Sequence, residues 1–412
     1  MTTPAPPVLD DVDSGPSPST AGQLPPVSAY RLLTATECQK RAAAATATAN
    51  YWDALNRQAR SGDLAAGWRY YAALEARNQA SAEALVLYYQ LAAWEAQRPL
   101  FRQALEVVET LQQRAEAARQ EKVPYPVDPE DVALQRLQLL QSLDEADSAI
   151  RLLNVELKRR LGWPAEPITE HLWPVGDFAV SPETLTPPVA ATLAEQDRPE
   201  LRGWRWARDR LNAQTLPQWH QEVLGLPGGD AEGQTLAERR WSGITDRLLH
   251  PWTRSRAYRM AEESQRQATR WRQQIETILV QRSREVADEA RSAAILLVQQ
   301  THKVAAARER LRRWDSRLRE ALRKREARQP NAELYELQVR WQRLLAEAEL
   351  INAVAAWHQA RVRLRAALGW YAYDHLMAED SSASPPRSGP EAVPPAEGNA
   401  KAGHPAADKP SS

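Results

Sequence analysis

The side chains that carry most enzyme chemistry are present in this sequence, but they are not grouped in catalytic patterns. No two histidines flank a glutamate at the spacing that places both on one face of a helix, as a zinc site requires. No glycine-rich phosphate loop follows a strand, and no serine sits between elbow glycines. The seven histidines are His171, His220, His250, His302, His358, His375 and His404. We therefore expect no enzyme activity, no cofactor and no metal site.

Thiol and carboxylate chemistry is equally unsupported. Cys38 is the only cysteine, which excludes an intramolecular disulfide and a cysteine zinc cluster, so we expect it to pack as a small apolar residue. Carboxylates such as Asp144, Glu145 and Asp147 are plentiful, but on helices they usually form solvated faces or ion pairs. Neither residue type predicts a catalytic group.

One run of basic residues stands out in an otherwise balanced chain with 53 basic and 53 acidic residues. It comprises Arg308, Arg310, Arg312, Arg313, Arg317, Arg319, Arg323, Lys324, Arg325 and Arg328. A basic strip is able to bind nucleic acid or anionic lipid. The favoured interpretation is a solvated helix face paired with acidic neighbours, because interleaved exposed aromatics are missing. We expect no nucleic-acid partner.

The elements that position these residues are predicted to be long helices. Ala, Leu, Arg, Gln and Glu dominate the middle of the chain, which favours helices over sheets. Neither Gly nor Pro occurs from Trp252 to Gln329, or from Asn331 to Leu368. A helix over 259–328 would be on the order of 100 Å long. With Asn331 available as the N-cap of a return helix, this predicts an antiparallel hairpin.

The first half repeats this plan in shorter form. A helix is predicted from Trp68 to about Glu121, with a kink at Pro99. Asp128 followed by Pro129 is a strong start signal for the return helix. That helix is expected to run to Leu161, where Gly162 would terminate it.

The two return helices are also related in sequence. "LNVELKRRLGW" ends at Trp163 and "ARVRLRAALGW" ends at Trp370, and a shift of 207 positions superimposes their apolar seams. The seams are Leu139, Leu143, Ala146, Ile150, Leu153, Leu157 and Leu161, and Ala346, Leu350, Ala353, Trp357, Ala360, Leu364 and Leu368. Their spacing is that of a coiled coil, so we infer an internal duplication.

The long second-half helix has a seam of its own. Many of its members are small: Ala287, Ala290, Ala294, Leu297, Thr301, Val304, Leu311, Leu318 and Leu322. Small residues allow helices to approach closely and lie side by side in a wall.

We expect five regions along the chain. They are a disordered segment (1–29), a first hairpin repeat (30–163), a connector with short helices (164–258), a second hairpin repeat (259–375) and a disordered Pro/Ser/Ala-rich tail (376–412). The start lacks the basic and apolar stretches of a secretory signal. No stretch reaches the roughly 18 uninterrupted apolar residues of a membrane-spanning helix.

Several stretches resemble the TolC family of outer-membrane efflux and secretion channels, over roughly residues 31 to 370. "ALVLYYQLAAWEAQ" from Ala84 is similar to the start of the family's first long helix, and "IRLLNVELKRRLGW" from Ile150 to the end of its return helix. "DRPEL" from Asp197 resembles the element that opens the second half. "REVADEARSAAILLVQQTHKVAAARERL" from Arg284 and "AWHQARVRLRAALGW" from Ala356 are similar to the second pair of helices.

The resemblance implies an all-α tandem repeat of long antiparallel coiled-coil hairpins that forms one protomer of a homotrimeric helical barrel. It implies a passive conduit in the outer membrane and periplasm that works with a periplasmic adaptor and an inner-membrane pump. The two hairpin tips would contact the adaptor, through Pro126, Val127, Asp128, Asp131, Val132, Pro330 and Asn331. The alternative is that both tips are ordinary capped turns.

Other features favour different interpretations. The gap 57–68 is too short, and the gap 224–252 lacks the alternation, for the membrane strands of about nine to eleven residues that the family contributes. A soluble coiled-coil scaffold is therefore the alternative function, and a nucleic-acid-bridging coiled coil a third. Trp204, Trp206, Trp241 and Trp252 fit either an aromatic membrane belt or, as favoured here, the core of a domain junction. Trp94, Trp271, Trp314, Trp341 and Trp357 are expected to pack between helices.

Overall fold

The computed structural model describes residues 30–57, 63–121, 127–163, 171–176, 178–181, 185–223, 251–329 and 331–373. The predicted tails, 1–29 and 376–412, lie outside these ranges.

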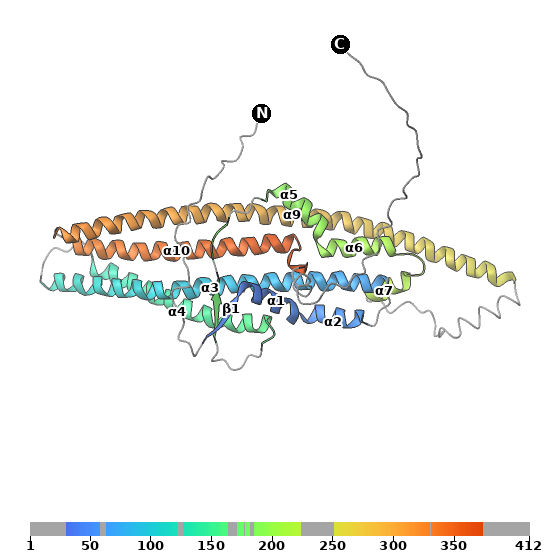
Figure 1. The fold of residues 1–412 in the computed structure, drawn as a ribbon, viewed down its shortest axis with the longest axis horizontal. Coiled ribbons are helices and arrows are strands. Elements are labelled where there is room, and N and C mark those ends of the chain that lie inside the picture. Colours follow the sequence, from blue (N-terminus) through green and yellow to red (C-terminus); the bar gives the residue numbers. More distant parts are fainter. Residues whose placement is uncertain are drawn as a thin grey trace, which may run out of the picture. The chain divides into compact units, whose positions relative to one another are not determined.

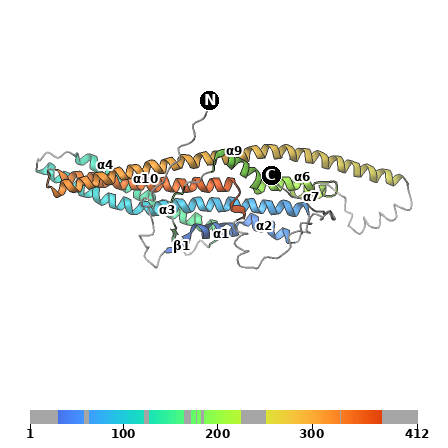
Figure 2. The same ribbon diagram turned by 45° about the horizontal axis from the view of Figure 1, so that its top comes forward.

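Four long helices form two antiparallel hairpins. α3 (Leu64–Gln120) is followed by α4 (Pro129–Arg160), and α9 (Pro251–Glu326) by α10 (Ala332–Ala367). α10 packs against both α9 and α3, and α4 packs against α3; Figures 1 and 2 show α10 between α9 and α3. The predicted all-α tandem repeat of helical hairpins is confirmed. None of the helices in the described part of the chain is long and apolar enough to cross a membrane.

The helix starts agree with the sequence at one hairpin and differ at the other. Asp128 caps α4 by accepting a hydrogen bond from the backbone N–H of Glu130 at 3.0 Å, and Pro129 occupies the first turn. Asn331 stands at the N-cap position of α10, but its side chain makes no capping hydrogen bond. Its backbone is left-handed (φ 60°), because the chain reverses there after a left-handed Arg328 (φ 52°). The expected capping by Asn331 was therefore wrong.

The helix ends explain the repeated Leu-Gly-Trp. Gly162 and Gly369 both adopt positive φ (66° and 75°) directly after the last helical turn. In each case the N–H of the following tryptophan donates back into the last turn, from Trp163 to Lys158 O and from Trp370 to Arg365 O, both at 3.0 Å. This is the Schellman motif, in which glycine avoids the penalty that a Cβ imposes.

The apolar seams follow the predicted phase with one correction. Most seam residues of α4 and α10 are buried, whereas Leu143, Leu153 and Ala353 are partly buried. In α9 the seam ends on Ala321, which is fully buried, and the predicted Leu322 is 37% exposed. The straight helix drifts relative to a strict seven-residue repeat, so a neighbouring position takes over at its far end. α3 also continues through Pro99 as one helix.

Shorter helices and a small sheet pack against the long helices α3 and α9. β1 (Tyr30–Thr34) pairs in parallel with β2 (His171–Val175), a small sheet that the sequence did not predict. α1 (Ala35–Ala45) and α2 (Ala47–Asn56) pack on α3. α5 (Pro187–Asp197) packs on α9, α6 (Pro199–Arg210) on α3 and α9, and α7 (Leu216–Val223) on α3. Cys38 of α1 is buried in the hydrophobic core that these elements form with the long helices, and this burial raises the pKa of its thiol.

Candidate functional site

The two hairpin ends lie together at one end of the long helices, the left end in Figure 1. Val132 at the start of α4 is fully buried and shares a hydrophobic core with Leu334 of α10 and Leu111 of α3. The two predicted contact segments are thus packed into one structural unit by residues from both repeats. Sequence spacing within each repeat could not have shown this pairing.

The predicted contact residues divide into buried and exposed groups. Val132 is an internal packing residue, and Val127 is partly buried against the same core. Asp128, Asp131 and Asn331 are exposed. The remaining two, Pro126 and Pro330, lie outside the described residues. A partner would therefore meet a polar surface supported by an apolar core.

One ion pair joins the two hairpin ends, and others lie within the second hairpin. Arg114 of α3 pairs with Glu333 of α10 at 2.5 Å, and this lowers the pKa of the Glu333 carboxyl. Glu336 is 2% exposed and accepts from Arg325 and Arg340, each at 2.8 Å. An open cavity of about 400 Å³ lies beside Arg114, Asn331 and Glu333. This end is polar, charged and hollowed.

The basic run on α9 is answered by acidic residues of α10. Arg310 pairs with Glu349, and Arg325 pairs with Glu336. In the reverse direction, Arg343 of α10 pairs with Asp315 of α9 at 2.7 Å. Within α9, Arg313 and Lys324 pair with Glu309 and Glu320. These pairs support the interpretation of a helix face neutralised by its neighbours.

The Arg-Pro-Glu-Leu element joins the two repeats through one buried arginine. Arg198, at the junction of α5 and α6, is 6% exposed. Its guanidinium pairs with Glu75 of α3 at 3.2 Å and with Glu289 of α9 at 2.7 Å. It also donates to the carbonyl of Ala367 at the end of α10, at 3.4 Å. Three long helices therefore converge on a single planar donor, a geometry that suits arginine and not lysine.

Solved structures of outer-membrane channels share this arrangement of helices. Neither a protein-family model nor a curated protein sequence matches the chain. The CmeC outer membrane channel of Campylobacter jejuni is 11% identical over 74% of this chain and 66% of its own, with a TM-score of 0.53. The outer membrane protein VceC of Vibrio cholerae is 14% identical over 74% and 73%, with a TM-score of 0.50.

The MtrE outer membrane channel of Neisseria gonorrhoeae, in its open state, is 13% identical over 74% and 69%, with a TM-score of 0.50. This chain has the TolC-type fold. It spans about two thirds of the length of the channels that it matches. At these identities the TolC-type fold is what the comparison establishes.

Within the TolC-type fold, Trp204 and Trp206 near the repeat junction are partly buried and pack against the hydrophobic core. Trp204 of α6 stacks edge-on against Trp68 of α3, with ring centroids 4.7 Å apart. Trp206 donates from its indole to the carbonyl of Leu64 at 3.3 Å. Trp357 of α10 is fully buried and donates to Thr301 of α9 at 3.0 Å. The side chains of Trp241 and Trp252 lie outside the described residues.

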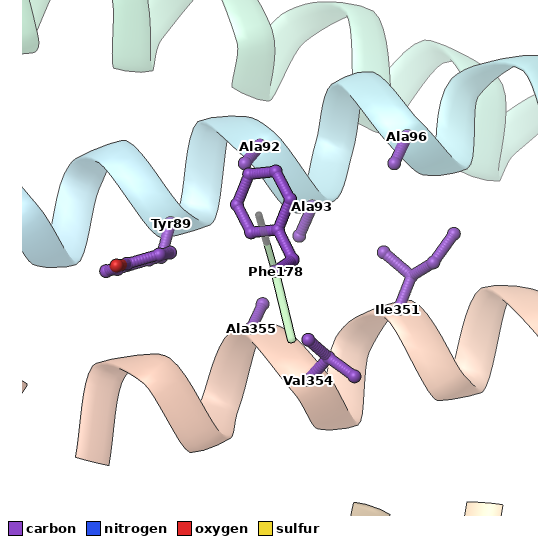
Figure 3. Close-up of a pocket in the computed structure, with 8 residues that line it drawn as sticks. All are labelled: Tyr89, Ala92, Ala93, Ala96, Phe178, Ile351, Val354 and Ala355. Atoms are coloured by element: carbon purple, nitrogen blue, oxygen red, sulfur yellow. The ribbon is translucent and has the colours of Figure 1, made fainter. Parts of the chain in front are cut away.

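A small apolar gap separates α3 from α10 near the middle of the fold. Figure 3 shows Phe178, from the segment after β2, beside alanines of α3 and Val354 and Ala355 of α10. The gap has a volume of about 20 Å³. Tyr89 stacks on buried His358 beside it, with ring centroids 4.5 Å apart and an interplanar angle of 13°. The residues around the gap are apolar or aromatic, so they offer packing and no catalytic group.

The described residues contain no cluster of three or more His, Cys, Asp or Glu side chains that could hold a metal ion. The residue that sequence reasoning missed is Arg198. Its only signal was the Arg-Pro-Glu-Leu stretch itself, because the partners of Arg198 come from helices distant in the sequence.

Proposed function

We propose that this chain is the outer-membrane channel component of a tripartite efflux or type I secretion system, and acts as a passive conduit. Three copies would place their hairpins side by side to close a tunnel, and transport would be diffusion through it. The TolC-type fold supports this proposal.

The observation that carries the proposal is a pair of apolar edges on α4 and α9. On α4, Leu152 is 72% exposed and Val155 is 59% exposed, and Leu134 and Leu137 lie five helical turns earlier on the same faces. On α9, Ile295 is 59% exposed, and Val280 and Val298 share its side of the helix. Exposed apolar residues that recur along one side of a helix are candidates for an association surface.

A second copy is the occupant that fits both edges. α4 and α9 belong to different hairpins, with α10 and α3 between them in the packing order. If the α4 edge of one copy met the α9 edge of the next, each contact would be head-to-tail, and a closed ring would cover every edge. The homotrimer is the closed ring that the TolC-type fold favours.

The exposed residues of the hairpin ends are proposed to contact a periplasmic adaptor, which in turn would connect to an inner-membrane pump. Asp128, Asp131 and Asn331 offer polar groups there, and Val132 holds the surface from within. A photo-crosslinking residue at position 131 should capture the adaptor in cells, whereas one at exposed Glu145 on α4 should not. Equal capture at both positions would contradict the tip assignment.

The function is tested by efflux in whole cells. A strain that lacks this chain should retain a fluorescent efflux dye, and the full chain should restore its release and fractionate with the outer membrane. Complementation by a Leu152→Glu/Val155→Glu variant should fail, because two carboxylates on the α4 edge would prevent assembly. The scaffold alternative would instead be supported if the wild-type chain is only monomeric by native mass spectrometry and if its deletion leaves dye release and protein secretion unchanged.

A further inference from the structure

A second cavity, separate from the hairpin ends, lies between α2, α3 and α6. Its volume is about 380 Å³, which is within the range of small-molecule sites, roughly 300–1,000 Å³. Its walls combine aromatic rings with two carboxylates. The residues that define its chemistry are Trp52, Trp68, Tyr71, Glu75, Glu200 and Trp204.

The aromatic wall depends on close approach of α6 to α3. Gly203 of α6 faces Tyr71 and Trp68, and a Cβ added there would lie 3.1 Å from the Tyr71 Cβ. This approach brings Trp204 edge-on to Trp68, and both indoles line the cavity. Trp52 of α2 contributes a third, partly exposed indole. The faces of such rings carry negative potential and attract cations.

The charges around the cavity leave a surplus of carboxylate. Glu75 is 9% exposed, and its Oε1 accepts from Arg198 and Gln79, at 3.2 and 3.1 Å. Its Oε2 is buried and has no hydrogen-bond partner within the described part of the chain. Burial raises the pKa of Glu75, and Arg198 is the main opposing influence. A buried carboxylate oxygen without a partner is costly unless a ligand satisfies it.

The second carboxylate, Glu200, also shares its arginine with another acidic residue. Glu200 pairs with Arg282 of α9 at 2.6 Å, but Arg282 also serves Glu285. Arg198 likewise serves both Glu75 and Glu289. Two guanidinium groups are thus shared among four carboxylates. The described residues that line the cavity include no Lys, Arg or His.

We propose that this cavity binds an organic cation, a quaternary or protonated amine with an aromatic or alkyl body. The cationic group would lie near Glu75 and Glu200, and its body would pack on Trp52, Trp68 and Trp204. An inorganic cation fits less well, because it needs several converging oxygen ligands and this wall is mostly aromatic. The site is built within one chain, so it stands independently of the channel proposal.

The probe is benzyltrimethylammonium, titrated into the purified full chain by calorimetry. Saturable binding with one site per chain is expected, while neutral benzyl alcohol and the anion benzenesulfonate should bind at least tenfold more weakly. Trp52→Ala and Glu200→Gln should each weaken binding of the cation by roughly three- to thirtyfold, the range expected for loss of one cation–π or charge contact.

Matched controls separate the cavity from general effects of substitution. Trp314→Ala and Glu347→Gln remove a partly buried indole on α9 and an arginine-paired carboxylate on α10, away from the cavity, and should leave affinity unchanged. Thermal melting followed by circular dichroism verifies that each variant is folded. If Trp52→Ala is unfolded, Trp52→Phe provides a milder change at the same position. The proposal is overturned if the cation does not bind, if benzyl alcohol binds as tightly, or if the cavity variants bind like wild type.

Discussion

Glu95 is the buried acid whose environment is least matched to its charge. It lies in α3 with 3% of its surface exposed, and neither carboxylate oxygen has a hydrogen-bond partner within the described residues. Arg98 Nη2 is 3.8 Å from Glu95 Oε2, and the Nη1 of the same guanidinium is 3.5 Å from Asp147 Oδ1 of α4. Burial raises the pKa of Glu95 to about 7, with Arg98 opposing and Asp147 adding to the shift.

This pKa predicts how stability varies with pH. A carboxyl whose pKa is higher in the folded than in the unfolded chain contributes stability that is complete below the unfolded value of 4.5 and lost as the pH rises through about 7. Between pH 5 and pH 8 the wild type should lose roughly 2 to 3 kcal/mol that Glu95→Gln does not lose. Urea unfolding midpoints of both proteins, measured across this range, check the difference.

A matched control for this residue is Glu145→Gln, at an exposed site on α4. Its pH profile should follow that of the wild type. Parallel profiles for wild type and Glu95→Gln would show that the Glu95 carboxyl stays ionised in the folded protein throughout.

At the scale of elements, the two Schellman ends fix where each return helix stops and what packs on it. Gly369 has φ 75°, and a Cβ added there would lie 2.7 Å from the Pro199 Cδ and 3.1 Å from the Arg198 Cα. Gly162 has φ 66°, and its added Cβ would lie 2.9 Å from the Ala45 Cβ. Each glycine thus serves a turn and a close contact with a segment that precedes it in the chain, Ala45 for Gly162 and 198–199 for Gly369.

Gly369→Ala should therefore destabilise the protein by at least about 1–2 kcal/mol, the cost of a left-handed backbone for a residue with a Cβ. The total loss should be larger, because the added Cβ also clashes with the rigid ring and backbone at 198–199. Thermal unfolding would show this as a lower midpoint. Gly176→Ala is the matched control, because its added Cβ meets only the Tyr88 hydroxyl, at an ordinary 3.4 Å. Equal midpoints for the two variants would exclude a special role for Gly369.

At the scale of the whole molecule, head-to-tail assembly makes a prediction that self-matched interfaces do not. Leu152→Glu/Val155→Glu should disable the α4 edge, and Ile295→Glu/Val298→Glu the α9 edge, so each variant alone should be monomeric. An equimolar mixture retains one intact pairing, between the α9 edge of the first and the α4 edge of the second. The mixture should form heterodimers and no trimers, as read by native mass spectrometry.

The same measurement has a clear contrary outcome. If α4 edges paired with α4 edges and α9 edges with α9 edges, each variant by itself would form homodimers through its unmodified edge. Trimers in either single variant would show that these edges do not hold the assembly together. Leu139→Glu is unsuitable as a test, because Leu139 is 5% exposed inside the α3–α4 contact and its change would disturb folding.

The sequence by itself determined the local plan of this protein. Helix periodicity placed the seams at residues such as Ile150 and Trp357, and the start at Asp128 and the stop at Gly162 followed from capping chemistry. These features depend on residues within one or two helical turns of each other, so their spacing is visible in the chain. The resemblance in "DRPEL" pointed to the junction that Arg198 organises, but did not reveal its partners.

Only the tertiary structure decided how equivalent positions differ and which distant residues meet. Leu137 and Leu344 correspond in the duplication, yet Leu137 is 58% exposed and Leu344 is 6% exposed, because α10 has a helix on each side and α4 packs along α3. Other features also join segments far apart in sequence: Val132 shares a core with Leu334, β1 pairs with β2, and Glu75 and Trp204 line one cavity. Such contacts are set by the packing of whole helices, which no local spacing encodes.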